Sequence, residues 1–152
     1  MDIVIRDAEE RDIDAMAGLL EGLFAKEADF TPDRRRQEAG LALLLRSGAV
    51  ALCAERQGEV VGMATMQFLV STAMGAPSGL VEDVVVKDGL RGGGVGRRLL
   101  EELVRRAKEA GCRRLQLVAD EDNAPAHGFY RHLGWRETNL RAWHRIGGEE
   151  PE

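Results

Sequence analysis

The chain has only two cysteines in 152 residues, which argues against a disulfide framework and against a structural zinc site. Cys53 and Cys112 belong to no C-x-x-C or Cys/His cluster, and such clusters are what those two kinds of site need. The three histidines lack metal-ligand spacing as well. We therefore expect free thiols and assign no metal.

The chain also lacks an excess of basic charge and long apolar runs. Its formal net charge is −5, whereas proteins that bind nucleic acid through bulk electrostatics need a basic face. No apolar run approaches the roughly 18 residues that span a bilayer, and the N-terminus MDIVIRDAEERD is unlike a secretory signal. The sequence predicts a soluble, cytoplasmic protein with no nucleic-acid or membrane partner, and it points to small molecules as ligands.

The length predicts one domain, spanning residues 1–146, and the polar tail 147–152 (GGEEPE) is expected to be disordered. Hydrophobic periodicity predicts strands at 3–6, 49–55, 59–70, 80–86, 114–119 and 142–146. It predicts helices at 12–24, 95–110 and 125–133. A further helix is predicted to start at Thr31–Pro32 and to end at about residue 47, and residues 71–79 are predicted to form a loop. This order indicates an α/β fold with a sheet of mixed direction, an antiparallel meander first and one βαβ crossover later.

The unusual segment is RGGGVGRR, residues 91–98, at the start of the helix predicted from 95. Glycine lowers helix stability by roughly 1 kcal/mol relative to alanine, so four glycines need a reason. The first backbone N–H groups of a helix have no partner inside it and carry partial positive charge. Glycines give an anion access to these groups, and Arg91, Arg97 and Arg98 add charge. A plain connecting turn would not need this composition.

The spacing of the glycines narrows the kinds of phosphate ligand that the loop could bind. A P-loop needs a lysine after the glycines, and none is present. A dinucleotide fingerprint needs a third glycine where Arg97 or Leu99 stands, although Asp120 imitates the acid that binds ribose. The dinucleotide interpretation is therefore weakened but stays open.

Two motifs carry a family resemblance. Arg91, Gly94 and Gly96 fit R-x-x-G-x-G, and NAPAHGFYRHLGW, from Asn123, fits N-x-x-A-x-x-F-Y-x-x-x-G-[FW] about 30 residues later. In both, the sequence resembles the GNAT superfamily of acyl-CoA-dependent N-acyltransferases. The resemblance implies a GNAT-like α+β fold: a central, mostly antiparallel twisted sheet with one βαβ crossover and flanking helices. KDGLR departs from the family by lacking the proline and aromatic residue that often precede the arginine.

The resemblance also implies a co-substrate and residue roles. Acetyl-CoA would be the co-substrate, with Tyr130, the only tyrosine of the chain, as the general acid for the departing thiolate. Ordinary packing on a short apolar helix is the alternative for this ring. Asn123 would both cap its helix and contact the CoA arm. The residues expected to bind the coenzyme are Val84, Val85, Val86, Arg91, Gly92, Gly93, Gly94, Val95, Gly96, Arg97 and Asn123.

Glu82 is the second candidate catalytic residue. An alkylamine has a pKa of about 10.4, so a proton acceptor near it helps the reaction at pH 7. Alternation along VEDVVV would place Glu82 on the side of Val84 and Val86, with Asp83 opposite. In the diamine acetyltransferases that this segment resembles, the corresponding glutamate is a proposed base. Three alternatives stay open: an acceptor-binding role for Glu82, a solvated carboxylate, and Asp83 or water as the base.

These expectations combine into an N-acetyltransferase that moves an acetyl group from acetyl-CoA to a primary amine of a small molecule by direct attack. Two alternatives remain open: a GNAT that acts on a protein N-terminus or lysine, and a non-catalytic nucleotide- or CoA-binding module. Homodimers are common among the resembling enzymes, so a homodimer is compatible with the resemblance.

Overall fold

The structure is a computed structural model that describes residues 2–26 and 32–147. The chain divides into two compact units, Met1–Leu117 and Val118–Glu152. None of the helices within the described ranges has the length and apolar character needed to cross a membrane. Most of the predicted tail, residues 148–152, lies outside the described residues.

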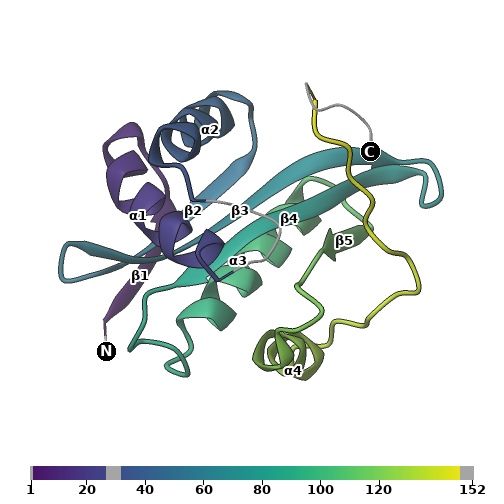
Figure 1. Cartoon of the computed structure of the whole chain (residues 1–152). Helices are drawn as coiled ribbons and strands as arrows, with labels where there is room; N and C mark the ends of the chain where they lie inside the picture. The colour runs from purple at the N-terminus through teal and green to yellow at the C-terminus, as the bar shows by residue number, and fades with distance from the viewer. Residues whose placement is uncertain (1, 27–31, 148–152) are drawn as a thin grey trace. The chain divides into compact units, whose positions relative to one another are not determined.

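The first unit is built on a five-stranded sheet with the spatial order β1-β2-β3-β4-β5. Strands β1 to β4 pair antiparallel, whereas β4 and β5 pair parallel, on either side of the α3 crossover (Figure 1). The predicted mixed sheet with one βαβ crossover is therefore confirmed. The strands are β1 (Ile3–Asp7), β2 (Val50–Arg56), β3 (Glu59–Ser71), β4 (Ala76–Val86) and β5 (Arg114–Leu117).

Helices cover both faces of this sheet. The 3₁₀ turn η1 (Glu10–Asp12), α1 (Ile13–Phe24) and α2 (Arg34–Arg46) lie on one face, and α3 (Val95–Glu109) lies on the other (Figure 1). Beneath α1 and α2 the core consists of Met16, Ala17, Leu20, Leu41, Cys53, Met63 and Val85. On the α3 face, a Cβ added to Gly62 would stand 3.1 Å from Val95 and 3.2 Å from Leu99. The glycine therefore lets α3 pack close to β3.

Some predicted boundaries were wrong, among them the end of the strand predicted at 114–119, which stops at Leu117, and one predicted strand did not form. Helix α2 begins two residues later than the Thr31–Pro32 signal suggests, because the side chain of Asp33 accepts a hydrogen bond from the Arg36 N–H and caps the helix. Thr31 lies outside the described residues. Residues 76–79 continue β4 instead of forming a loop, since they pair with residues 68–71 of β3. The segment 142–146 is not a strand and pairs with no described strand.

A buried ion pair joins β1 to the start of α1. The Arg6 guanidinium donates to both carboxylate oxygens of Asp12, at 2.7 and 2.9 Å, and the Glu9 N–H donates to Asp12 at 2.8 Å. Asp12 is only 4% exposed. The hydrogen bonds from Arg6 hold the pKa of this carboxyl below its ordinary value. The charge of Asp12 therefore stabilises the folded state.

We expect Asp12→Asn to lower the free energy of unfolding by about 2–3 kcal/mol at pH 7, because it removes the charge that binds Arg6 through two hydrogen bonds and leaves only the longer pairing of Arg6 with Glu55, at 3.3 Å. A carboxyl whose pKa is lowered on folding contributes stability above its unfolded pKa of about 3.9 and loses it as the pH falls. Urea unfolding at pH 7 and at pH 3 measures both effects. The matched control is Asp7→Asn, an exposed carboxylate paired with Arg106, which should change stability by less than about 1 kcal/mol. Equal effects of the two variants would contradict this prediction.

Candidate active site

The connection between β4 and α3 is the glycine-rich loop predicted to bind an anion. Helix α3 begins at Val95, and its N-cap is Gly94, with φ +85° in the left-handed region. Gly92 has φ +84°. Residues with a Cβ rarely adopt these conformations. The backbone path of the loop therefore requires glycine at these two positions.

The loop presents a row of unpaired backbone donors. The N–H of Arg98 donates to the Gly94 carbonyl at 3.1 Å, so the N–H groups of Val95, Gly96 and Arg97 precede the first hydrogen bond within the helix. No side chain caps this helix end. The N-terminus of α3 therefore offers several N–H donors and partial positive charge to an anion.

Space for such an anion exists over the loop. A Cβ added at Gly92 or Gly94 would meet no heavy atom within 4 Å. The absence of side chains at these positions thus leaves the backbone open, which fits the requirement of a diphosphate for close approach to N–H groups.

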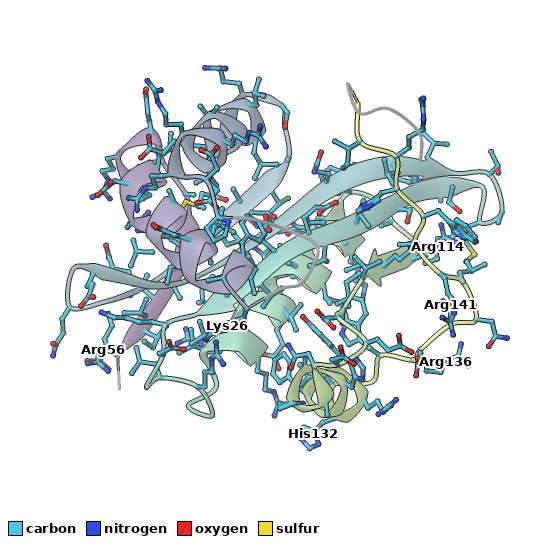
Figure 2. The ribbon with its side chains drawn as sticks, viewed as in Figure 1. Lys26, Arg56, Arg114, His132, Arg136 and Arg141 are labelled. Carbon is cyan, nitrogen blue, oxygen red and sulfur yellow. The ribbon has the colours of Figure 1, made fainter. Side chains whose placement is uncertain are left out.

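Two cations stand beside the loop and share one carboxylate. Asp88 accepts a hydrogen bond from Lys26 at 3.1 Å and lies 3.3 Å from the Arg91 guanidinium. The hydrogen bond from Lys26 holds the pKa of Asp88 below its ordinary value. All three side chains are at least half exposed, and exposed ion pairs contribute only about 0–1 kcal/mol. Both cations therefore remain available to an anionic ligand. Figure 2 labels Lys26, which follows α1 in the chain.

The other two arginines of the segment are engaged differently. Arg97 donates to Glu101, one turn along α3, at 2.8 Å. Arg98 donates to the carbonyl of Ile3 on β1 at 2.6 Å. The expectation that all three arginines add charge at the loop therefore needs correction for Arg98, whose guanidinium is bound to β1.

An open groove of about 460 Å³ lies beside the end of β4. One wall is α1, where Gly18 and Gly22 stand four residues apart and contribute no side chains to the groove. The opposite wall is the end of β4 with the first residues of the loop. The groove is lined by Ala15, Gly18, Leu19, Gly22, Leu23, Lys26, Glu59, Val60, Val85, Val86, Lys87, Asp88 and Arg91.

The strand β4 carries a bulge at the position of Glu82. Ala64 of β3 pairs with Val84, and Met66 pairs with Val81. One residue of β3, Thr65, thus stands opposite two residues of β4, Glu82 and Asp83. Such a bulge breaks the alternation of side chains along the strand. Simple alternation through VEDVVV therefore does not fix the side on which Glu82 lies, and that assignment stays a prediction.

The two carboxylates of the bulge have different environments. Glu82 is exposed, yet partial desolvation raises its pKa, and the neighbouring negative charge of Asp83 raises it further. Burial raises the pKa of Asp83, and a hydrogen bond from Thr65 opposes that rise. The Thr65 hydroxyl donates to Oδ2 of Asp83 at 2.8 Å, and the Asp83 N–H donates to the same hydroxyl oxygen at 3.2 Å. Of the pair, Glu82 is the carboxylate that faces solvent.

The second unit contains α4 (Ala124–His132), which carries the remaining candidates. Asn123 is the N-cap, and its side-chain oxygen accepts a hydrogen bond from the Ala126 N–H at 3.2 Å. The predicted capping role is confirmed. Tyr130 is half-buried, and its ring makes edge-on contacts with Phe129 and Trp135, with centroids 5.4 and 6.0 Å apart. Burial raises the pKa of its hydroxyl, so the group is a proton donor at neutral pH.

The structure thus gathers most predicted site residues on two continuous segments. The first segment runs along β4, the loop and the first turn of α3, and it carries Glu82, Val84 to Val86, and Arg91 to Arg97. Asn123 and Tyr130 lie together on α4. Sequence reasoning missed Thr65 and Lys26, which reach the site from β3 and from the end of α1. Within the described part of the chain, no group of three or more potential metal ligands occurs.

The fold and this arrangement of motifs agree with a known family. The model of the acetyltransferase (GNAT) family matches residues 13–135, and the chain belongs to that family. It is an acyl-CoA-dependent N-acetyltransferase, and acetyl-CoA is the co-substrate that the family uses.

Two relatives and one solved structure are similar to this chain over most of its length. Aminoglycoside N(6')-acetyltransferase type 1 of Stenotrophomonas maltophilia is 31% identical over 145 residues, 93% of this chain and 92% of that protein. Glucosamine 6-phosphate N-acetyltransferase of Trypanosoma brucei brucei is 29% identical over 140 residues, 90% of each chain. An aminoglycoside N-acetyltransferase solved in complex with CoA superposes with a TM-score of 0.81 at 19% identity, covering 96% of this chain and 95% of that one. The last comparison confirms the predicted GNAT-like fold.

Proposed function

We propose that the protein transfers an acetyl group from acetyl-CoA to a primary amine of a small molecule by direct attack. The observation that carries this proposal is the open row of backbone donors at the start of α3, directly after the strand that bears Glu82. Such a row suits a diphosphate, and the strand before it suits an extended chain that leads from the diphosphate to a reacting thioester.

Each coenzyme contact has a proposed partner. The N–H groups of the loop and of the first turn of α3, from Gly92 to Arg97, bind the diphosphate, and Arg91 adds charge. The backbone of Val84, Val85 and Val86 pairs with the pantetheine arm, and Asn123 contacts the same arm. Acetyl-CoA itself supplies the activated acetyl group.

The reaction needs two proton transfers besides the attack. The amine nitrogen forms a bond to the thioester carbon, and the carbon–sulfur bond then breaks. Glu82 takes the proton that the amine loses, directly or through a water molecule. Tyr130 donates a proton to the departing CoA thiolate. A carboxylate with a raised pKa is a stronger base than an ordinary one, which suits this role for Glu82.

Amino sugars are the first acceptors to test. The names of two relatives specify an aminoglycoside and glucosamine 6-phosphate as their substrates, and both molecules carry primary amines on sugar rings. A thiol-release assay with acetyl-CoA should therefore include both compounds, simple diamines, and peptides with a free N-terminus or lysine. We expect CoA release with at least one small amine. Release with peptides alone would indicate a protein acceptor, and no release with any compound would indicate a binding module.

We expect Glu82→Gln to lower kcat on the order of 10-fold at pH 7, because glutamine cannot accept the amine proton. The loss should shrink as the pH approaches the amine pKa of about 10.4, where free amine is abundant. Steady-state rates between pH 6 and pH 10 measure this dependence. Glu109→Gln, an exposed carboxylate on α3, serves as the control and should leave kcat unchanged. A constant deficit across the pH range would argue against the role of base.

A further inference from the structure

The bulge of β4 is held by a single side chain from the neighbouring strand. Thr65 is completely buried, and its hydroxyl both donates to the Asp83 carboxylate and accepts from the Asp83 N–H. A side chain on β3 thus binds the backbone and the carboxylate of one bulged residue at once. We call this pair of hydrogen bonds the Thr65–Asp83 clasp.

An apolar core lies next to the clasp. Two residues further along the same strands, Met63 and Val85 belong to the core that packs beneath α1 and α2. The core residues contributed by these helices are Met16, Ala17, Leu20 and Leu41. The titratable member of that core is Cys53 on β2, whose pKa is raised by burial to about 12, so the thiol is neutral. The Thr65 hydroxyl is therefore the group that supports a charge on Asp83.

The orientation of this hydroxyl decides which form of Asp83 it favours. A threonine hydroxyl has one proton, and here that proton is directed at the carboxylate. A hydrogen bond donated to a carboxylate stabilises its ionised form and opposes the effect of burial. The clasp therefore opposes the effect of burial and favours negative charge directly beside Glu82, the adjacent residue in the bulge.

We propose that Thr65 is a positioning residue for acetyl transfer: its clasp on Asp83 fixes the bulge that presents Glu82 to the acceptor amine and maintains a negative neighbour for Glu82. The inference rests on the proposed function, in which Glu82 accepts the amine proton. Asp83 has a supporting role in this arrangement, because its carboxylate is engaged by Thr65 whereas that of Glu82 faces solvent. The negative neighbour makes Glu82 a stronger base.

Two substitutions at one position separate the hydroxyl from the shape of the side chain. Thr65→Val keeps the branched shape and removes both hydrogen bonds, whereas Thr65→Ser keeps the hydroxyl and removes a methyl group. We expect Thr65→Val to lower kcat by about threefold, less than Glu82→Gln does because Glu82 is still present, with the KM for acetyl-CoA changed by less than about twofold. Thr65→Ser should retain most of the wild-type kcat. Equal kcat values for wild type and Thr65→Val would overturn the proposal.

A second measurement does not depend on turnover. Carboxyl titrations of ¹³C-labelled protein by NMR report the pKa of Glu82 in wild type, Thr65→Val and Asp83→Asn. Both substitutions weaken or remove the negative charge beside Glu82, so its pKa should fall in both variants. An unchanged Glu82 pKa in both variants would contradict the electrostatic part of the proposal. Glu109, distant in sequence and exposed, provides the internal reference.

The two experiments separate this inference from the proposed function. If wild type releases no CoA with any amine, the proposed function fails, and the NMR titration still decides whether the clasp acts on Glu82. If wild type is active and Thr65→Ser loses as much kcat as Thr65→Val, with an equal drop in melting temperature, the residue serves packing alone. That result would also overturn the positioning role.

Discussion

Tyr130→Phe should lower kcat by about 100-fold while leaving the affinity for acetyl-CoA nearly unchanged. Phenylalanine keeps the ring and therefore the edge-on contacts with Phe129 and Trp135, so α4 should fold as before. It removes only the hydroxyl that we propose as the proton donor to the CoA thiolate. General acid catalysis typically contributes 10²- to 10⁴-fold to a rate, which sets the expected scale of about 100-fold. Steady-state kinetics gives kcat, and calorimetric titration gives the affinity for acetyl-CoA.

The pH dependence provides an independent test of the same assignment. Burial raises the pKa of Tyr130 above its ordinary value of about 10, so the hydroxyl stays protonated through neutral and mildly alkaline pH. The Tyr130-dependent part of kcat should therefore be lost only as the pH rises through that raised pKa. The phenylalanine variant should lack this alkaline limb. A variant with unchanged kcat and a raised KM for acetyl-CoA would instead indicate a packing role for the ring.

The parts of the fold with strong local patterns were predictable from the sequence. Helix α3 is the clearest case, because its apolar residues recur on one face and Leu99, Leu103 and Ala107 are completely buried. The donors of the glycine loop were also predictable, since every helix start has unpaired N–H groups, whereas the left-handed backbone at Gly94 was not predicted.

Features that depend on two strands were not predictable in this way. Nothing in the segment VEDVVV marks a bulge, yet the pairing of β4 with β3 shifts at Glu82 and Asp83. The residue opposite the shift is Thr65, the one hydroxyl in the otherwise apolar run VVGMATM. That lone polar residue in a buried strand was the available signal, but nothing local connects it to a residue 18 positions away.

Contacts between residues far apart in the sequence could not be predicted from local patterns either. The ion pair of Lys26 with Asp88 joins residues 62 positions apart, and no periodicity in either segment indicates it. The segment 142–146 alternates like a strand, but a strand needs a partner for its backbone groups, and the described chain supplies none. The homodimer, the cytoplasmic location and the absence of nucleic-acid partners stay predictions, as do the roles of the site residues.

Gly94→Ala should weaken acetyl-CoA binding by about 10- to 100-fold. A methyl group at this position would enter the open space over the loop, where no protein atom lies within 4 Å. The coenzyme diphosphate would then lose close contact with the N–H groups of the first turn of α3. Hydrogen bonds to charged groups contribute about 1.5–3 kcal/mol each, and the loss of one corresponds to about a 10- to 100-fold change in the dissociation constant. Isothermal titration calorimetry with acetyl-CoA measures it.

Helix α3 offers a matched control at its other end. Gly111 also has a left-handed backbone, with φ +83° against +85° for Gly94, and an added Cβ there would likewise meet nothing within 4 Å. Alanine at either position should therefore cause a similar backbone strain of about 1–2 kcal/mol. The two glycines are separated by the length of the helix, about 25 Å. Gly111→Ala should accordingly lower the melting temperature by a similar amount and leave acetyl-CoA binding unchanged.

The comparison of the two variants distinguishes coenzyme access from backbone strain. If the Gly94 variant alone loses affinity, with equal destabilisation in both, the loop binds the diphosphate through its exposed N–H groups. If both variants bind acetyl-CoA as wild type does, the space over Gly94 is not occupied by the coenzyme. The glycines would then be explained by the left-handed turn alone, and the coenzyme contacts proposed for Gly92 to Arg97 would have to be abandoned.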